Sequence, residues 1–317
     1  MPLKARYLPP QTTPLRGSRE LMNSSCCIAS FSPSEEALYL WQNALVDLSF
    51  QHEFLLDGIL ALSAIHKAVL RPEASNPLRL RSPEYIDLAI KSFRFHLDRP
   101  SATTIVPLFS LSSLLVVYNF AVAQIQPPDD PIAALCHMAR LMKGIAQITS
   151  NSRDLWDHLL ASVVKPLLIS LDRDLTGVSE TPELLRLRDW VIHMQDLDPV
   201  IRKTYLESID ELHVVFRNVR SPDGGKRSPI AVALIWPATL SPSFLDYLDR
   251  KDPVALVILA HFAILCRLHE DAWFMRSWGG WIFEAVEKEL GPQYQSYVEW
   301  PRQALQPAEV MAREAYE

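Results

Sequence analysis

The densest group of potential metal ligands in the sequence consists of Cys266, His269, Glu270 and Asp271. On a helix, Cys266 and His269 would share a face, because residues three positions apart are neighbours. A structural zinc site needs about four ligands, however, and no second Cys/His pair with suitable spacing stands out. We therefore predict neither a metal site nor a cofactor, and interpret the segment as a buried thiol followed by a polar helix end.

Acidic residues that could hold Mg²⁺ against a diphosphate, the chemistry of an all-helical terpene cyclase, form an incomplete set. Asp129 and Asp130 are followed by Pro131 and apolar residues, so a third carboxylate is missing. Asp172 and Asp174 are two residues apart and would point to different faces of a helix. The sequence also lacks a G-x-S-x-G nucleophile elbow and a glycine-rich phosphate loop. We predict no catalytic residues.

Two histidines and a tryptophan cluster are better suited to binding an apolar molecule. His66 and His261 each lie in an otherwise apolar segment, where a histidine is usually a hydrogen-bonded core residue but can also orient a ligand. Three tryptophans lie within nine positions beside two glycines, which permit close backbone approach: Trp273, Trp278, Trp281, Gly279 and Gly280. This cluster is either a corner packed into the core or the mouth of a hydrophobic cavity.

The composition narrows the class of protein. The 317 residues are 49% hydrophobic, enough for a sizeable core or for a core that encloses a cavity. The formal net charge is −6 and the basic residues form no long run, so we expect no direct nucleic-acid binding by this chain. Four cysteines, of which only Cys26 and Cys27 are close together, suit a reducing compartment.

Residues 103–128 carry no charge, and about 20 apolar residues suffice to cross a bilayer. Serine, threonine, asparagine and glutamine side chains interrupt this segment, and no basic cluster flanks it. We therefore predict a buried helix and no membrane span.

The clearest local signal is a recurrent helix start, in which Ser, Thr or Asp precedes Pro. The side-chain oxygen can accept hydrogen bonds from the first turn, and proline at the first helical position has a suitable φ and no N–H to leave unpaired. The pairs that we interpret as helix starts are Ser32-Pro33, Ser82-Pro83, Asp130-Pro131, Thr181-Pro182, Asp198-Pro199, Ser241-Pro242 and Asp252-Pro253.

Between these starts the apolar residues follow helical spacing. Residues 54–69 and 254–265 are apolar almost all round, as in helices surrounded by other helices. Strand signals are weak and confined to residues 214–216 and 231–236. The predicted fold is all-α, an irregular multi-helix bundle with a mostly apolar core and room for an internal hydrophobic cavity.

The punctuation of the sequence predicts its organisation. Residues 1–30 are expected to be a loose lead-in, and residues 31–220 an N-terminal helical part. The segment SPDGGKRS is the basis for a linker at residues 221–229. A C-terminal helical part at 230–306 and a tail at 307–317 complete the chain.

Several segments resemble known blocks of one protein family. Residues 40–68, which include FLLDGILALSAIH, are similar to the start of the fungal-specific transcription factor domain of the sterol uptake control protein type. The blocks at 108–123 (LFSLSSLLVVYNFAVA), 129–131 (DDP) and 141–145 (LMKGI) follow in the family's order. So do Ile235-Trp236-Pro237, residues 252–265, the Trp273/Trp278-Gly279 corner and Glu299-Trp300-Pro301. The resemblance covers about residues 20–305.

The resemblance implies an all-helical effector domain that senses a hydrophobic small molecule, a sterol in the best-understood members, and controls transcription. The chain departs from the family in one respect: the DNA-binding zinc cluster needs six cysteines, whereas these residues include four, none in C-x₂-C spacing. We expect a sterol-like ligand, a nuclear or cytoplasmic location, and a second copy or a zinc-cluster transcription factor as partner.

By their chemistry alone, polar groups on the central apolar segment and the aromatic corner are the expected ligand contacts. The candidate residues are His66, Phe109, Ser112, Tyr118, Asn119, His261, Trp273, Trp278, Gly279 and Trp281. An alternative is an enzyme or carrier of fungal secondary metabolism that reuses the helical fold, and a third hypothesis is a dominant-negative dimerisation partner.

Overall fold

The computed structural model describes residues 39–306, except 75, 151–152, 166–167, 169–170, 174–176 and 222–228. The predicted lead-in, the start at Ser32-Pro33, most of the linker and the tail lie outside this part, and the division into segments stays a prediction. All regular structure in the described residues is helical, which confirms the predicted all-α class. The weak strand signal at 214–216 falls within a helix, and that at 231–236 falls on two short helices separated by a turn at Leu234.

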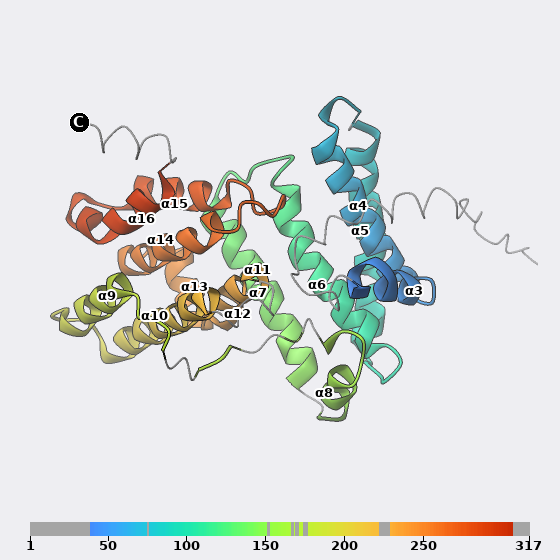
Figure 1. Ribbon diagram of the computed structural model, residues 1–317, viewed down its shortest axis with the longest axis horizontal. Coiled ribbons are helices and arrows are strands. Elements are labelled where there is room, and N and C mark those ends of the chain that lie inside the picture. Colours follow the sequence, from blue (N-terminus) through green and yellow to red (C-terminus); the bar gives the residue numbers. More distant parts are fainter. Residues whose placement is uncertain are drawn as a thin grey trace, which may run out of the picture.

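The helices follow one another along the chain, most of them joined by short connections, with a longer one of 21 residues between α8 and α9 (Figure 1). A π-helical turn, Leu40–Ala44, precedes the first of them, and 3-10 turns occur at Pro72–Ala74 and Pro292–Val298. The α-helices are α3 (Leu45–Ser49), α4 (Glu53–Leu70), α5 (Asn76–Leu97), α6 (Ile105–Val122), α7 (Pro131–Ser150), α8 (Arg153–Leu160), α9 (Pro182–His193), α10 (Pro199–Arg220), α11 (Pro229–Ala233), α12 (Ile235–Thr239), α13 (Pro242–Asp249), α14 (Pro253–Arg267), α15 (Trp278–Glu289) and α16 (Glu299–Leu305).

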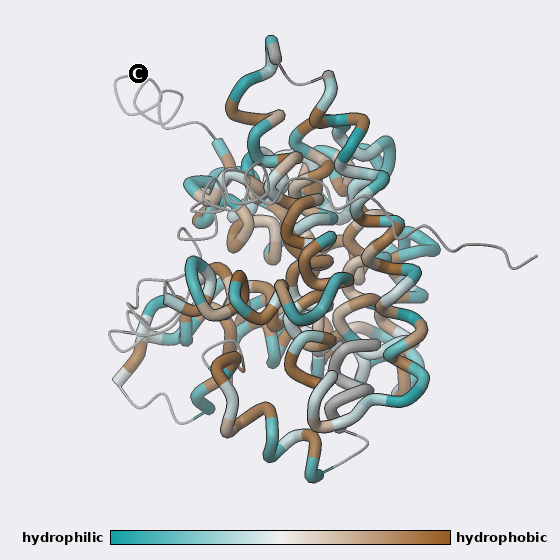
Figure 2. The backbone as a smooth tube through the Cα atoms, turned by 90° about the vertical axis from the view of Figure 1, so that its right-hand side faces the viewer, coloured by the Kyte–Doolittle hydropathy of each residue, from teal (hydrophilic) through white to brown (hydrophobic). Residues whose placement is uncertain are grey.

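The helices form two groups that meet along α6 and α7. On one side α4 packs against α5 and α6, and on the other α14 packs against α10, α15 and α16 (Figure 1). Helix α7 contacts α6 from the first group and α12, α13 and α15 from the second. The most hydrophobic parts of the chain run through the interior, as Figure 2 shows. Every residue from Val254 to Cys266 in α14 is buried, as the apolar run predicts.

Helix α6 coincides with the uncharged segment of the sequence. By length and composition it is the one helix of the described residues that could cross a membrane unaided, and 67% of its apolar window is buried inside the fold. A core helix of a soluble protein passes the same test. The burial agrees with the predicted buried helix.

The Ser/Thr/Asp-Pro pairs mark five helix starts as predicted, those of α7, α9, α10, α13 and α14. Asp252, for example, accepts hydrogen bonds from Val254 N and Ala255 N, at 3.0 and 3.1 Å. The same carboxylate accepts from the Tyr205 hydroxyl at 2.8 Å, so one side chain both begins α14 and joins it to α10.

The predicted start at Ser82-Pro83 is wrong, because α5 already begins at Asn76 and Pro83 lies inside it. The Ser82 hydroxyl is buried and donates to the carbonyl oxygen of Ala61 in α4 at 3.0 Å instead of capping a helix. An asparagine-proline pair, Asn76-Pro77, supplies the early proline of this helix.

A close crossing of α14 and α15 depends on Gly279. A β-carbon at this position would lie 2.8 Å from the carbonyl oxygen of Ala263 and 3.0 Å from the amide nitrogen of Arg267. Both neighbours are backbone atoms and cannot rotate away. At the next position, Gly280, a β-carbon would meet nothing within 4 Å.

We expect Gly279→Ala to lower the free energy of unfolding by about 1–3 kcal/mol, since the two helices must move apart. The matched control is Gly280→Ala, which adds the same methyl group to open space and should leave stability unchanged or raise it by up to about 1 kcal/mol through helix propensity. Urea denaturation of both variants measures the difference. Equal effects of the two substitutions would show that the crossing does not depend on position 279.

His261 makes the free energy of unfolding depend on pH. Its ring is buried in α14, with Nδ1 2.8 Å from the carbonyl oxygen of Val257, and burial lowers its pKa from 6.5 to about 4. The unfolded chain therefore binds a proton as pH falls below about 6.5 while the folded chain does not. The free energy of unfolding is therefore unaffected by this histidine above pH 6.5, and it falls progressively as the pH is lowered from 6.5 towards 4.

Between pH 8 and pH 5 we expect His261 to account for a loss of about 2 kcal/mol in the free energy of unfolding. Urea denaturation of the unaltered protein and of His261→Gln at both pH values measures this contribution, because the other histidines are common to the two proteins and cancel. A pH dependence unaffected by the substitution would contradict the assignment.

Candidate functional site

Residues 268–277, which we call the corner, connect α14 to α15 through a series of tight turns. Backbone hydrogen bonds run from Ala272 N to His269 O at 3.1 Å and from Met275 N to Ala272 O at 2.8 Å. The corner ends at Ser277, whose φ of 66° is left-handed. A non-glycine residue in this region costs energy and persists only where its surroundings enforce it.

Residues at and just after the end of α6 form hydrogen bonds that hold the corner in place. Gln124 Nε2 donates to the carbonyl oxygens of Phe274 and Arg276, at 3.1 and 2.8 Å. Trp278 Nε1 donates to the carbonyl oxygen of Phe120 at 3.2 Å, and the two rings meet edge-on with centroids 5.0 Å apart. The first group of helices thereby holds a loop that belongs to the second.

A third contact joins the corner to α4. The rings of His66 and Trp273 lie 4.6 Å apart, and both side chains are buried. Of the ten predicted ligand contacts, the structure thus brings His66, Trp273 and Trp278 to one region, from segments far apart in the sequence.

The corner contains two buried polar atoms that the fold leaves unsatisfied. In the part of the chain that the structure describes, Trp273 Nε1 and His269 Nε2 have no hydrogen-bond partner. Both side chains are more than nine-tenths buried, at 8% and 9% exposure. Leaving such a group unpaired costs about 1–3 kcal/mol, so each one needs an explanation.

The chemistry of these two atoms defines what they would accept. The indole N–H of Trp273 can only donate. Burial lowers the pKa of His269, which favours the neutral imidazole, and its Nε2 either donates or accepts depending on the tautomer. A largely apolar molecule with a hydroxyl or carbonyl oxygen matches such a set.

The polar residues of α6 are engaged elsewhere. Ser112 Oγ donates to Leu108 O at 2.8 Å and Asn119 Nδ2 to Leu115 O at 2.7 Å, both within the helix. The Tyr118 hydroxyl lies 3.2 Å from Ser82 Oγ on α5, and burial raises its pKa. Phe109 is half-buried against the core.

Of the remaining candidates, Trp281 lies beside Trp278, with ring centroids 5.7 Å apart, whereas His261 has other surroundings. His261 lies about two helical turns before the corner in α14, and its ring contacts that of Trp300 in α16, with centroids 5.6 Å apart. Gly279 serves the helix crossing. Half-buried Trp281 lines a cleft of about 270 Å³ together with acidic and basic side chains such as Asp130, Lys251 and Glu284.

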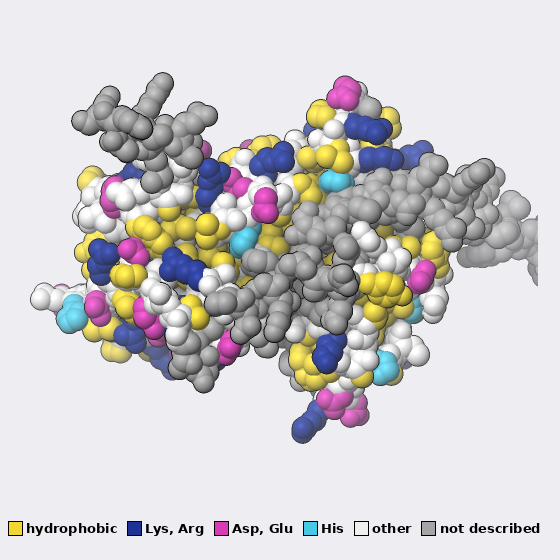
Figure 3. Space-filling view, viewed as in Figure 1, with side chains coloured by type: hydrophobic (Ala, Val, Ile, Leu, Met, Phe, Trp, Pro, Cys, Tyr) yellow, Lys and Arg dark blue, Asp and Glu magenta, His cyan; other side chains and the backbone are white. Residues whose placement is uncertain are grey.

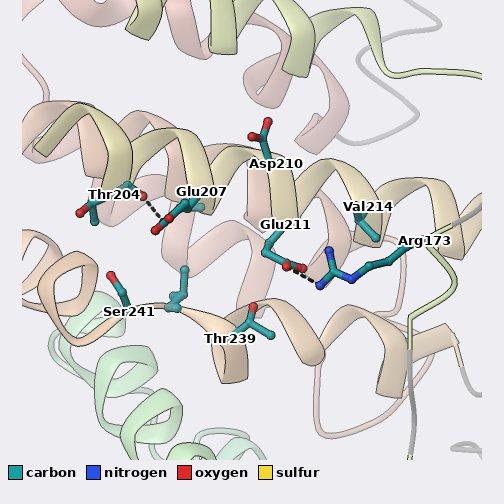
Figure 4. Close-up of a pocket in the computed structure, with 10 residues that line it drawn as sticks. Arg173, Thr204, Glu207, Asp210, Glu211, Val214, Thr239 and Ser241 are labelled. Carbon is teal, nitrogen blue, oxygen red and sulfur yellow. Dashed lines mark hydrogen bonds and ion pairs between the residues drawn. The ribbon is translucent and has the colours of Figure 1, made fainter. Parts of the chain in front are cut away.

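Another open cleft, of about 390 Å³, lies between α10 and residues 239–241 (Figure 4). None of the predicted contacts lines it. Three carboxylates of its lining each have a basic partner: Glu207 with Lys203 at 3.7 Å, Asp210 with Arg188 at 2.7 Å, and Glu211 with Arg173 at 2.5 Å. Because charged side chains line this cleft, it does not suit an apolar molecule.

Sequence reasoning missed two residues of the corner and its surroundings. Gln124 had no signal beyond being a polar residue after an apolar helix, and its partners are remote in sequence. His269 was considered only as a zinc ligand with Cys266. In the described residues no group of three or more His, Cys, Asp or Glu side chains is placed to hold a metal ion.

The chain is similar to a protein of Gibberella zeae named as a Zn(2)-C6 fungal-type transcription factor. The two are 22% identical over 300 aligned positions, which cover 85% of this chain and 57% of that protein. The chain therefore spans little more than half the length of this relative. No family model matches the chain. The similarity supports the general relationship to zinc-cluster transcription factors that the sequence blocks indicate.

Proposed function

We propose that this chain is the regulatory region of a fungal transcription factor and acts in the nucleus. The observation that carries the proposal is the similarity to a Zn(2)-C6 transcription factor along 85% of the chain. The net charge of −6 and the scarcity of cysteines agree with a part that does not itself contact DNA. A zinc-cluster module elsewhere in the polypeptide or in a partner would provide that contact.

The signal for regulation would be a sterol-like molecule bound at the corner. The unsatisfied Trp273 N–H and His269 Nε2 support this, because a hydroxyl group can accept a hydrogen bond from an indole N–H and can bond to an imidazole nitrogen in either tautomer. Three further buried residues of the corner, Ala272, Phe274 and Met275, are apolar, as residues of sites for apolar ligands are. The resemblance to sterol uptake regulators points to the same class of molecule.

The contacts of the corner support the proposal that ligand binding there affects the rest of the fold. It contacts α4 through His66, α6 through Gln124 and Trp278, and continues directly into α14 and α15. A ligand that forms hydrogen bonds with the unpaired atoms of the corner in one conformation but not in another shifts the equilibrium between the two conformations. The size of the shift is set by the difference between its affinities for them. The left-handed Ser277 marks the strained end of this segment.

A reporter assay tests the regulatory function. The full chain is fused to an unrelated DNA-binding domain in yeast, and transcription from the matching promoter is measured with normal and with depleted sterol. We expect transcription to depend on the chain and to change several-fold with sterol level. A fusion that is expressed and nuclear but gives the transcription of the DNA-binding domain alone would contradict the proposal.

We expect Trp273→Phe, which keeps a ring but removes the N–H, to weaken sterol binding about five- to tenfold, the equivalent of one hydrogen bond. Energy transfer from tryptophan to the fluorescent sterol dehydroergosterol gives the dissociation constant by titration. The control is Trp300→Phe, which alters a tryptophan beside His261 and away from the corner. Equal affinities for both variants would place the sterol elsewhere, and no saturable transfer in the unaltered chain would reject a sterol ligand.

A further inference from the structure

Helix α5 has apolar residues on two opposite faces. At about 100° per residue, one face carries Ser82, Ile86, Ala89 and Phe93. The first three are buried and Phe93 is half-buried; this face packs towards α4, where the ring of Phe93 lies 6.4 Å from that of Phe54. The opposite face has a second apolar stripe. Within the described residues, only the first stripe is buried by the fold.

We call this second face, made of Leu80, Glu84, Leu88, Lys91 and Phe95, the outer stripe. Its members fall within an arc of about 80°. Leu80, Leu88 and Phe95 are 72%, 55% and 77% exposed, respectively. Single exposed apolar residues are ordinary, but a row of them along one helix marks a contact surface. The end of the α4–α5 pair, with exposed hydrophobic and basic side chains, is at the upper right of Figure 3.

The order of residues along the outer stripe is self-complementary. If two copies of α5 lie antiparallel about a two-fold axis between positions 87 and 88, position 80 faces 95 and position 84 faces 91 of the other copy. Leu80 then meets Phe95 and Glu84 meets Lys91, each twice, while the two Leu88 side chains meet near the axis. A parallel pairing would instead oppose Glu84 to Glu84 and Lys91 to Lys91.

We propose that the outer stripe of α5 is a homodimer interface in which a second copy of this chain binds antiparallel. The charge pattern favours a second copy of this chain as the binding partner. In a contact with two-fold symmetry, if one position faces a second position of the other copy, that second position also faces the first position of the other copy, so Glu84 and Lys91 form two pairs of opposite charge. The stripe from Leu80 to Phe95 is about 22 Å long. Because a single-helix contact of this length is small, we expect a weak dimer, with a dissociation constant on the order of micromolar. The inference does not depend on the proposed ligand or on the proposed regulatory function.

Light scattering and sedimentation of the full chain over a concentration series test the interface. We expect a monomer–dimer equilibrium that Leu88→Lys shifts to monomer by raising the dissociation constant at least tenfold. The matched control is Val200→Lys, which introduces the same charged side chain at an exposed apolar residue of α10, outside both α5 and the corner. Circular dichroism verifies that both variants are folded, which exposed positions permit.

Charge exchange tests the register. Glu84→Lys and Lys91→Glu should each weaken the homodimer about tenfold, whereas the double variant should restore it. The two single variants mixed together should form a heterodimer. In that mixture one chain carries lysine at both positions and the other carries glutamate at both, so every charged pair across the interface is of opposite sign.

Three results would overturn the proposal. The first is a monomer at all concentrations up to about 100 µM, far above a micromolar dissociation constant. The second is a dimer that is insensitive to Leu88→Lys. The third is a double charge variant that dimerises as weakly as either single one.

Discussion

The crossing of α14 and α15 at Gly279 is the constraint on which the arrangement of the corner depends. The two backbones approach until a β-carbon would lie 2.8 Å from a carbonyl oxygen, so the chain must reverse within the ten residues 268–277. This reversal ends in a left-handed serine and turns the aromatic side chains of the corner towards the other group of helices. The ring of Trp273 contacts His66, and Trp278, the first residue of α15, contacts Phe120. Gln124 donates to backbone carbonyl oxygens of the corner.

This constraint explains why buried polar atoms remain unpaired at the corner and not elsewhere in its neighbourhood. On α6, serine and asparagine side chains satisfy themselves by bonding to the carbonyl oxygens of their own helix. The Trp273 N–H, in contrast, lies in a loop between helices and finds no acceptor among the described residues. The cost of that unsatisfied N–H is what an oxygen-bearing apolar ligand would remove.

Local features of the fold were predictable from the sequence, and contacts between remote segments were not. Five Ser/Thr/Asp-Pro pairs begin helices because capping and proline geometry act within one turn. Ser82-Pro83 misled the prediction because the serine bonds to another helix, which no local pattern reveals. The apolar runs identified α4 and α14 as core helices, since a helix without a polar face must be surrounded. The same holds for the candidate site. The contact between His66 and Trp273 depends on how the two groups of helices dock, and so does the lack of a hydrogen-bond partner at His269 Nε2.

The most direct measurement is the nuclear magnetic resonance signal of the Trp273 indole N–H, identified among the eight tryptophans by its absence in a Trp273→Phe sample. If the corner binds a sterol through this group, addition of sterol shifts the proton resonance downfield, as formation of a hydrogen bond requires. The account would be contradicted if the Trp273 N–H resonance stays unchanged when an excess of sterol is added, whether the sterol binds elsewhere or does not bind.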